Sequence, residues 1–436
     1  MSTPTDDIDE EERELALLEA RRLSELGTIE QNESSYFEAR LCFEKSLTIY
    51  RAYGDLAGQA VATNQIASID RIQGHLREAM AQGKESLRIA RRLQNKRIEM
   101  AALSGLGLCY QNTGQHDEAI RYFSECIAIA RSVGDKKTEG INLGDLAINY
   151  RSKGQMQQAI DFFHEALAIA REVGNRRNQG AQLGNLGLTY KRTGQLEMAL
   201  EHTTEALTIA QEIRCPEHEL VSCGNIASIY LAQGRHTEAI TLNKRAIDIA
   251  QSIGDRNNKS IFLGNLALIY QIEGQWELAL SSFRKALNDA EELGNQVQVC
   301  IHRGNIGALL HKTQQLEEAE SALRSAIALG DTCLPPAAGA FRGSLALLLA
   351  EEGRFEDAKA EIELGEPLVR VDPNEHAKFL CKKAEALQHF GDAKGAQAAL
   401  AAARRLALEL GVTKESELSQ TIAKLEGLLS DTPTSA

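Results

Sequence analysis

A pattern that recurs every 40 residues is the feature that most limits how this chain can fold. The segment LGLCYQNTGQHDEAI at 106–120 returns as LAINYRSKGQMQQAI at 146–160 and as LGLTYKRTGQLEMAL at 186–200. The same spacing places tyrosine at 110, 150, 190, 230 and 270, and glycine at 74, 114, 154, 194, 234 and 274. A fixed period of this length indicates one supersecondary unit repeated in series, with each copy packed on the next.

The register extends in both directions from these central copies. Leu26, Gly27, Ala39 and Leu47 fit the first copy with Ser34 at its turn, and Gln314 replaces the turn glycine of the eighth. The spacing then shortens, because Gly353 pairs with Ala358 in one copy and Gly391 with Ala396 in the next. We therefore count ten copies.

Each copy is predicted to form two helices. In 156–170 the apolar positions 159, 160, 163, 166, 167 and 170 follow helical spacing, and Leu143, Leu146, Ala147 and Tyr150 share one face of the preceding segment. Glycine is predicted to end a helix, and the Asp or Asn after it to cap the next, at positions 54–55, 134–135, 174–175, 254–255 and 294–295. No proline lies between Pro4 and Pro216, which favours uninterrupted helices.

These residues resemble the tetratricopeptide repeat (TPR). The family pattern of Leu-Gly and Tyr on the first helix and two alanines on the second matches Leu186, Gly187, Tyr190, Ala199 and Ala206, and Phe123, Phe163 and Phe283 fill its aromatic position. The resemblance covers roughly 10–411. The long period is similar to that of LGN/Pins adaptors, kinesin light chains and bacterial Rap-type regulators. The resemblance implies an all-α solenoid, a right-handed superhelix whose concave face is lined by the first helices.

The predicted organisation has five parts. They are an acidic disordered tail at 1–12, eight repeats at 13–330, two divergent shorter repeats at 331–411, a capping helix at 412–430 and a disordered tail at 431–436. The capping helix is predicted from the stripe of Leu418, Ile422, Leu425 and Leu429. The segment DTCLPPAAGA at 331–340 is predicted to be a longer connection and a possible joint.

Composition argues against several classes of function. The ten histidines are scattered, the eight cysteines form no CxxC pair, and we find neither a GxxxxGK[ST] loop nor a GxSxG motif. We therefore expect no enzyme activity, no cofactor and no metal site. A net charge of −13 argues against nucleic acid, no apolar run is long enough for a membrane span, and unpaired cysteines indicate the cytoplasm.

Two neighbouring columns on the first helices are the candidate binding site. One is glycine, at 144, 184, 224, 264 and 304, and the next holds Asp145, Asn185, Asn225, Asn265 and Asn305. The glycines allow either close approach of adjacent helices or close approach of a ligand. The asparagine amides either bridge successive repeats or hold a peptide backbone, because an amide both donates and accepts. The resemblance to kinesin light chains and LGN-like adaptors favours contact with an extended partner segment.

A basic rim follows the ends of the first helices. Its residues are Arg151, Lys191, Arg192, His311 and Lys312. The rim is either simply solvated or selects an acidic ligand, and the acidic N-terminal tail is an alternative occupant. A second asparagine that LGN-like repeats often carry is replaced here by mostly apolar residues at 148, 188, 228, 268 and 308, which favours an amphipathic ligand.

The predicted function is a scaffold or adaptor that binds a protein or peptide of unidentified sequence in the concave groove. Two alternatives stay open. One is a regulatory solenoid that binds a signalling peptide and changes conformation, and the other is a self-associating structural module that forms a homo-oligomer.

Overall fold

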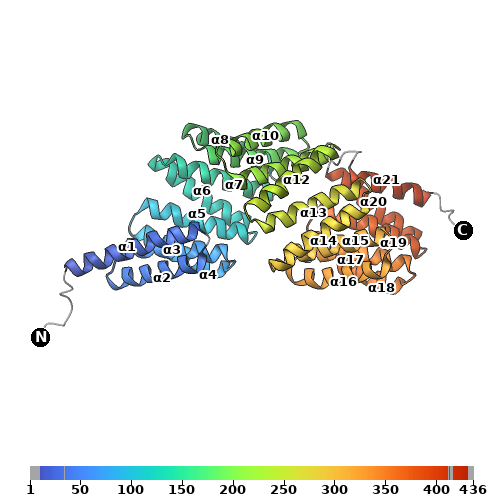
Figure 1. Cartoon of the computed structure of the whole chain (residues 1–436), viewed down its shortest axis with the longest axis horizontal. Coiled ribbons are helices and arrows are strands. Elements are labelled where there is room, and N and C mark those ends of the chain that lie inside the picture. The colour runs from blue at the N-terminus through green and yellow to red at the C-terminus, as the bar shows by residue number, and fades with distance from the viewer. Residues whose placement is uncertain (1–9, 34, 411, 413–415, 431–436) are drawn as a thin grey trace. The chain divides into compact units, whose positions relative to one another are not determined.

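The computed structural model describes residues 10–33, 35–410, 412 and 416–430 (Figure 1). Within these residues every regular element is a helix, and most helices that follow one another in the chain pack together. The chain divides into two compact units, Met1–Arg214 and Cys215–Ala436. This confirms the prediction of an all-α chain built from about ten helix pairs.

The first unit holds five helix pairs. They are α1 (Glu10–Asn32) with α2 (Tyr36–Ala52), α3 (Leu56–Ile72) with α4 (Leu76–Arg92), α5 (Lys96–Asn112) with α6 (His116–Val133), α7 (Lys136–Ser152) with α8 (Met156–Glu172), and α9 (Arg176–Arg192) with α10 (Leu196–Glu212). The predicted acidic tail at 1–12 lies outside the described residues except for 10–12, which form the first turn of α1. Ser34, predicted at the first turn, also lies outside them.

The second unit holds five further pairs and one more helix. They are α11 (Pro216–Ala232) with α12 (His236–Ser252), α13 (Arg256–Ile272) with α14 (Trp276–Glu292), α15 (Gln296–Lys312) with α16 (Leu316–Cys333), α17 (Pro335–Glu351) with α18 (Phe355–Val369), α19 (Pro373–His389) with α20 (Ala393–Glu409), and then α21 (Glu417–Ser430). In α21 the predicted stripe of Leu418, Ile422, Leu425 and Leu429 is buried against α19 and α20. The tail at 431–436 lies outside the described residues.

The prediction of a long connection at 331–340 is wrong. Residues 331–333 complete α16, and α17 begins at Pro335, so that only Leu334 lies between the two helices. The misleading signal is the Pro335-Pro336 pair. Proline breaks a helix interior but is tolerated in its first turn, where the backbone N–H has no intrahelical acceptor.

Local capping signals are confirmed in detail. The side chains of Asp55, Asp135, Asn175, Asp255 and Asn295 each accept a hydrogen bond from the backbone N–H three residues later, at 2.9–3.2 Å. The turn that lacks glycine at Gln314 keeps the left-handed conformation, with φ of 62°. The repeat geometry therefore imposes this backbone conformation even where the residue does not favour it.

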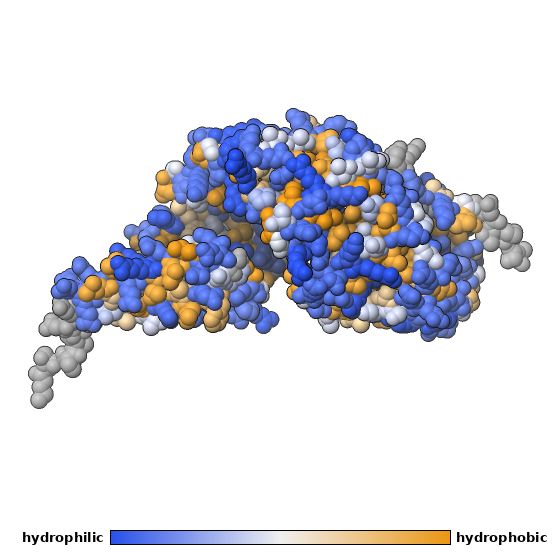
Figure 2. Space-filling view, in the orientation of Figure 1, coloured by the Kyte–Doolittle hydropathy of each residue, from blue (hydrophilic) through white to orange (hydrophobic). Residues whose placement is uncertain are grey.

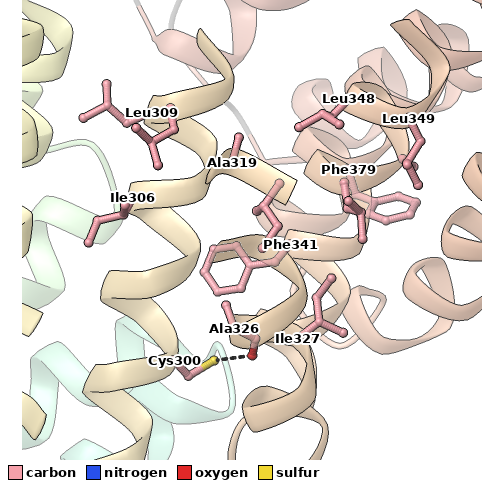
Figure 3. Packing of buried hydrophobic residues seen from close by; sticks show 14 of the residues in the cluster. Cys300, Ile306, Leu309, Ala319, Ala326, Ile327, Phe341, Leu348, Leu349 and Phe379 are labelled. Atoms are coloured by element: carbon pink, nitrogen blue, oxygen red, sulfur yellow. Dashed lines mark hydrogen bonds between the residues drawn. The ribbon is translucent and has the colours of Figure 1, made fainter. Parts of the chain in front are cut away.

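Small and aromatic residues alternate in the core, as the repeat pattern predicts. Phe123, Phe163 and Phe283 are fully buried, and so are the alanines of the column that contains Ala199. Figure 3 shows the corresponding packing in the second unit, where Phe341 and Phe379 lie among leucines and alanines from α15 to α19. Burial raises the pKa of the thiols of Cys126, Cys223, Cys300 and Cys381 to about 11, so these cysteines are packing residues rather than nucleophiles.

Candidate functional site

We call the odd-numbered helix of each pair its first helix. A first helix presents four sides, and α7 shows all of them. Leu146 and Ala147 are buried, and Asn149 bonds with α5, the first helix before it. Gly144 lies against α9, the first helix after it. Asp145 occupies the remaining face, which we call the open face. The column of Asp145, Asn185, Asn225, Asn265 and Asn305 is called the open-face column below.

Several hydrogen bonds between successive first helices come from the columns beside the open-face column. Ser104 Oγ donates to Asn142 Oδ1 at 2.7 Å, and Asn149 Nδ2 donates to Gln111 Oε1 at 2.7 Å. In the second unit Ser260 Oγ and His302 Nε2 are 3.0 Å apart. Sequence reasoning missed these bridging residues because no repeated residue type marks their positions.

The glycine column is explained by close approach of the next first helix. A Cβ built on Gly224 would lie 2.2 Å from the Phe262 ring, and one on Gly264 would lie 2.7 Å from the His302 ring. A Cβ on Gly144 would lie 2.5 Å from the amide of Gln182. The structure therefore supports the packing interpretation at these positions rather than access for a ligand backbone.

Gly304 and Gly180 provide a contrasting pair of substitutions. A Cβ on Gly304 would lie 2.1 Å from the buried Phe341 ring, so Gly304→Ala is expected to destabilise the protein by about 1–3 kcal/mol. A Cβ on Gly180 would lie 3.4 Å from the side chain of Ile209, which is ordinary contact, so Gly180→Ala is expected to stabilise it by about 0.5–1 kcal/mol through helix propensity. Urea unfolding followed by circular dichroism measures both, and equal effects of the two variants would contradict the packing explanation.

The asparagines of the open-face column differ in their bonding. Asn185 is half-buried, and its backbone and side-chain oxygens both accept from Arg151 Nη1 at 3.3 Å, so it partly bridges two repeats. The side-chain amides of Asn225, Asn265 and Asn305 make no hydrogen bond with any described residue, and Asn265 is exposed. The structure places Asp145 and Asn185 in the first unit and these three in the second.

The predicted basic residues of the first unit lie close together at the ends of α7 and α9. Burial lowers the pKa of Arg151 to about 10, and the nearby positive charge of Arg192 adds to the effect. Burial also lowers the pKa of Lys191, again with a contribution from Arg192. Among the described residues none of the three pairs with a carboxylate, whereas Arg91, Arg131 and Arg171 do. This excess of positive charge favours an anionic group on a ligand.

Asp145 is the one acidic member of the open-face column. Burial raises the pKa of this carboxyl group to about 7, and the positive charge of Arg71 partly offsets the rise. The carboxylate makes no hydrogen bond or ion pair with the described residues. Arg71 was not predicted as a site residue, although it belongs to the same column of the repeat as Arg151 and Lys191.

In the second unit the basic rim has partners inside the chain. The Lys312 ammonium lies 4.8 Å from the centre of the Trp276 ring, and His311 Nε2 lies 2.9 Å from Glu351 Oε2. Arg151 likewise lies over a ring, that of Phe163 at 5.6 Å, so the difference between the two units is the carboxylate partner of His311. An anion-binding role is therefore better supported in the first unit than in the second.

Comparison with known proteins identifies the repeat. Models of the tetratricopeptide repeat match 18–92, 99–172, 138–212, 178–252, 218–291, 258–331 and 308–364, which together cover most of the chain. The chain belongs to the TPR family. No curated protein sequence matches this TPR chain significantly.

Three solved structures share the TPR fold at low identity. A Rap protein complexed with competence and sporulation factor is 14% identical, with a TM-score of 0.57 over 81% of this chain and 99% of that one. Aspartyl phosphate phosphatase F from Bacillus subtilis is 13% identical, with a TM-score of 0.55 over 86% and 97%. The quorum sensor NprR from B. thuringiensis, in its apo form, is 16% identical, with a TM-score of 0.52 over 79% and 99%.

The helices and the potential metal ligands of the described residues also bear on function. None of their helices is both long and apolar enough to cross a membrane. Among the same residues no group of three or more His, Cys, Asp or Glu side chains is arranged to hold a metal ion.

Proposed function

We propose that this TPR protein is a non-enzymatic binding protein that holds an extended or amphipathic peptide segment on the open face of its first helices. TPR arrays bury their apolar faces between repeats, so the open face is the surface left for a partner. The Rap protein with a similar fold was solved in complex with a factor, and NprR is described as a quorum sensor, which supports a peptide or protein as the ligand class.

The observation that carries this proposal is the unequal bonding of neighbouring polar columns. The amides of Asn142 and Asn149 are satisfied between helices, whereas those of Asn225, Asn265 and Asn305 have no partner in the described chain. An asparagine within a helix lowers helix propensity, and its repetition on an unpaired face is best explained by bonds to a ligand backbone. An extended peptide offers such donors and acceptors whatever its sequence.

The basic cluster of Arg151, Lys191 and Arg192 adds a charge preference. A ligand carboxylate or C-terminal group placed there would relieve the repulsion between these cations. Because Asp145 lies on the same unit with a raised pKa, a cationic ligand group beside it would favour the ionised carboxylate. We therefore propose that the ligand carries an acidic group toward the α9 end of this face.

A regulatory form of the same function is a second candidate. Its support is that one protein with a similar fold is described as a quorum sensor, and that another was solved in complex with competence and sporulation factor. In that case the bound peptide would change the conformation of the chain. Small-angle scattering with and without a bound peptide separates the two, because a scaffold keeps its radius of gyration and a sensor changes it.

The charge preference is tested by reversing two cations of the first unit. A peptide selected from a random phage-displayed library on the natural protein serves as the labelled probe in fluorescence polarisation. Lys191→Glu combined with Arg192→Glu is expected to weaken binding of an acidic selected peptide about tenfold at low salt, and less at high salt.

The matched control reverses two cations that pair on exposed helix surfaces. Arg88 pairs with Glu85 and Arg121 with Glu118, so Arg88→Glu combined with Arg121→Glu makes the same change in net charge elsewhere. It is expected to leave binding within about twofold. Equal losses in the two double variants would show a general charge effect and would remove support for the anionic group.

A further inference from the structure

The N-terminal helix α1 carries an apolar stripe that the described chain leaves uncovered. Leu15, Leu18, Leu26 and Ile29 are exposed to 63%, 45%, 44% and 53%, and Arg22 lies midway between them. Figure 2 shows apolar residues interrupting the hydrophilic surface around α1 and α2. Leu15, Leu18, Arg22, Leu26 and Ile29 follow one another at spacings of 3, 4, 4 and 3, so all five lie on one side of the helix. The four apolar residues form a stripe along about 21 Å of α1, with Arg22 at its centre.

This stripe corresponds to the face through which TPR repeats stack. Forty residues later Leu18, Leu26 and Ile29 correspond to Gly58, Ile66 and Ile69 of α3, and Arg22 corresponds to Ala62, whereas Leu15 corresponds to Asp55, the N-cap of α3. There Ala62, Ile66 and Ile69 are buried in one cluster with residues of α2, the second helix of the preceding repeat. In α1 the same side of the helix has no described helix before it. A stacking face built to be buried is thus exposed.

The composition of residues 1–9 makes them a poor cover for this stripe. Their sequence, MSTPTDDID, offers Met1 and Ile8 as its large apolar residues and carries three aspartates. The first turn of α1 holds Glu10, Glu11 and Glu12, so close packing of this segment on α1 would bring like charges together. A partner that covers this stripe needs an apolar stripe of its own and a positive charge that can lie beside the carboxylates of α1.

The stripe is complementary to itself. The spacing of 3, 4, 4 and 3 reads the same in both directions from Arg22, which is the condition for pairing about a two-fold axis. In an antiparallel pair centred on Arg22, Leu15 of one copy would face Ile29 of the other, and Leu18 would face Leu26. We propose that two copies of this chain associate through α1 in this antiparallel register.

The charges around Arg22 fit the same register. Glu19 and Glu25 lie three residues before and after Arg22, and none of the three forms an ion pair within the described chain. In the two-fold arrangement the two Arg22 side chains meet at the axis, and Glu19 and Glu25 of the other copy lie one turn to either side of each. The apolar stripe then supplies the affinity, and these carboxylates offset the repulsion between the two Arg22 guanidinium groups.

The association is tested on the full chain by light scattering coupled to gel filtration over a wide range of protein concentration. The natural protein is expected to approach twice its mass of 47.7 kDa. Leu18→Glu combined with Leu26→Glu is expected to stay at the single-chain mass, with unchanged helicity and melting. A monomeric natural protein at every concentration, or a dimeric double variant, would overturn the proposal.

Two controls separate this register from unspecific apolar association. Leu278→Glu combined with Leu364→Glu changes two leucines that are exposed to 51% and 57% on other helices, and this variant is expected to remain dimeric. Under mild oxidation Arg22→Cys is expected to cross-link two copies, whereas Leu15→Cys is not, because residue 15 faces residue 29. Cross-linking of Leu15→Cys alone would show a parallel pair and overturn the antiparallel register.

Discussion

Replacing Asn225, Asn265 and Asn305, the asparagines of the open-face column in the second unit, by alanine is expected to weaken peptide binding by about one to three orders of magnitude. The variant combines Asn225→Ala, Asn265→Ala and Asn305→Ala. Each hydrogen bond from an amide to a ligand backbone contributes about 0.5–1.5 kcal/mol, and each 1.4 kcal/mol changes affinity about tenfold. The measurement is the dissociation constant for a peptide selected on the natural protein.

The same variant is expected to fold normally. Alanine favours a helix more than asparagine does, and the three amides have no partner in the described chain to lose. Asn185, which is bonded across a repeat through Arg151, is left unchanged. The control is Asn257→Ala combined with Asn288→Ala, which removes amides outside the open-face column. Normal folding with unchanged binding would place the ligand elsewhere, and loss of folding would show that the amides hold the repeats together.

The second unit is expected to lose about 3 kcal/mol of stability as the pH falls from 7 to 4. The cause is His302, which is buried between α13 and α15 with Nε2 beside Ser260 Oγ and Nδ1 without a partner. Burial lowers the pKa of His302 to about 4, against an ordinary value near 6.5. The unfolded chain therefore binds a proton through this pH range while the folded chain does not, so the stability present above pH 6.5 is lost as the pH falls toward 4.

The test compares the natural protein with His302→Phe. Phenylalanine already occupies the equivalent place in α13, where Phe262 covers Gly224 as His302 covers Gly264. Ser260 keeps its bond to the backbone oxygen of Ala286, so no buried hydroxyl is left unpaired. Urea unfolding followed by the fluorescence of Trp276, which lies in the second unit, gives the stability at each pH. If His302→Phe lost as much stability between pH 7 and pH 4 as the natural protein does, His302 would not be the cause of the loss.

Asp145, in the first unit, is expected to change the stability with pH in the direction opposite to His302. Its folded pKa is raised to about 7, so the neutral carboxyl group is favoured in the folded chain. The contribution of Asp145 to stability is then present below its ordinary pKa and is lost as the pH rises toward 7. The two groups lie in different units, so their pH effects are separable by Trp276 fluorescence and by circular dichroism of the whole chain.

Local signals in the sequence determined most of the fold. The turn glycines, the capping residues such as Asp135 and Asn175, and the helical spacing of apolar residues act within a few positions along the chain. For this reason they predicted the helix pairs, the caps and the buried stripe of α21. The 40-residue period also predicted that successive helix pairs stack, because every copy presents the same faces to its neighbours.

Tertiary structure decided what the repeat pattern left open. Whether a glycine allows a ligand or a neighbouring helix to approach depends on the side chain opposite it, and that side chain, such as Phe262 or Phe341, comes from the next first helix. The same holds for Asn185, which is bonded by Arg151, and for Asn265, which is unpaired. The division at Arg214 likewise follows from contacts between helices. Such contacts depend on the distance between side chains of different repeats. The residue types and their spacing along the chain do not give that distance.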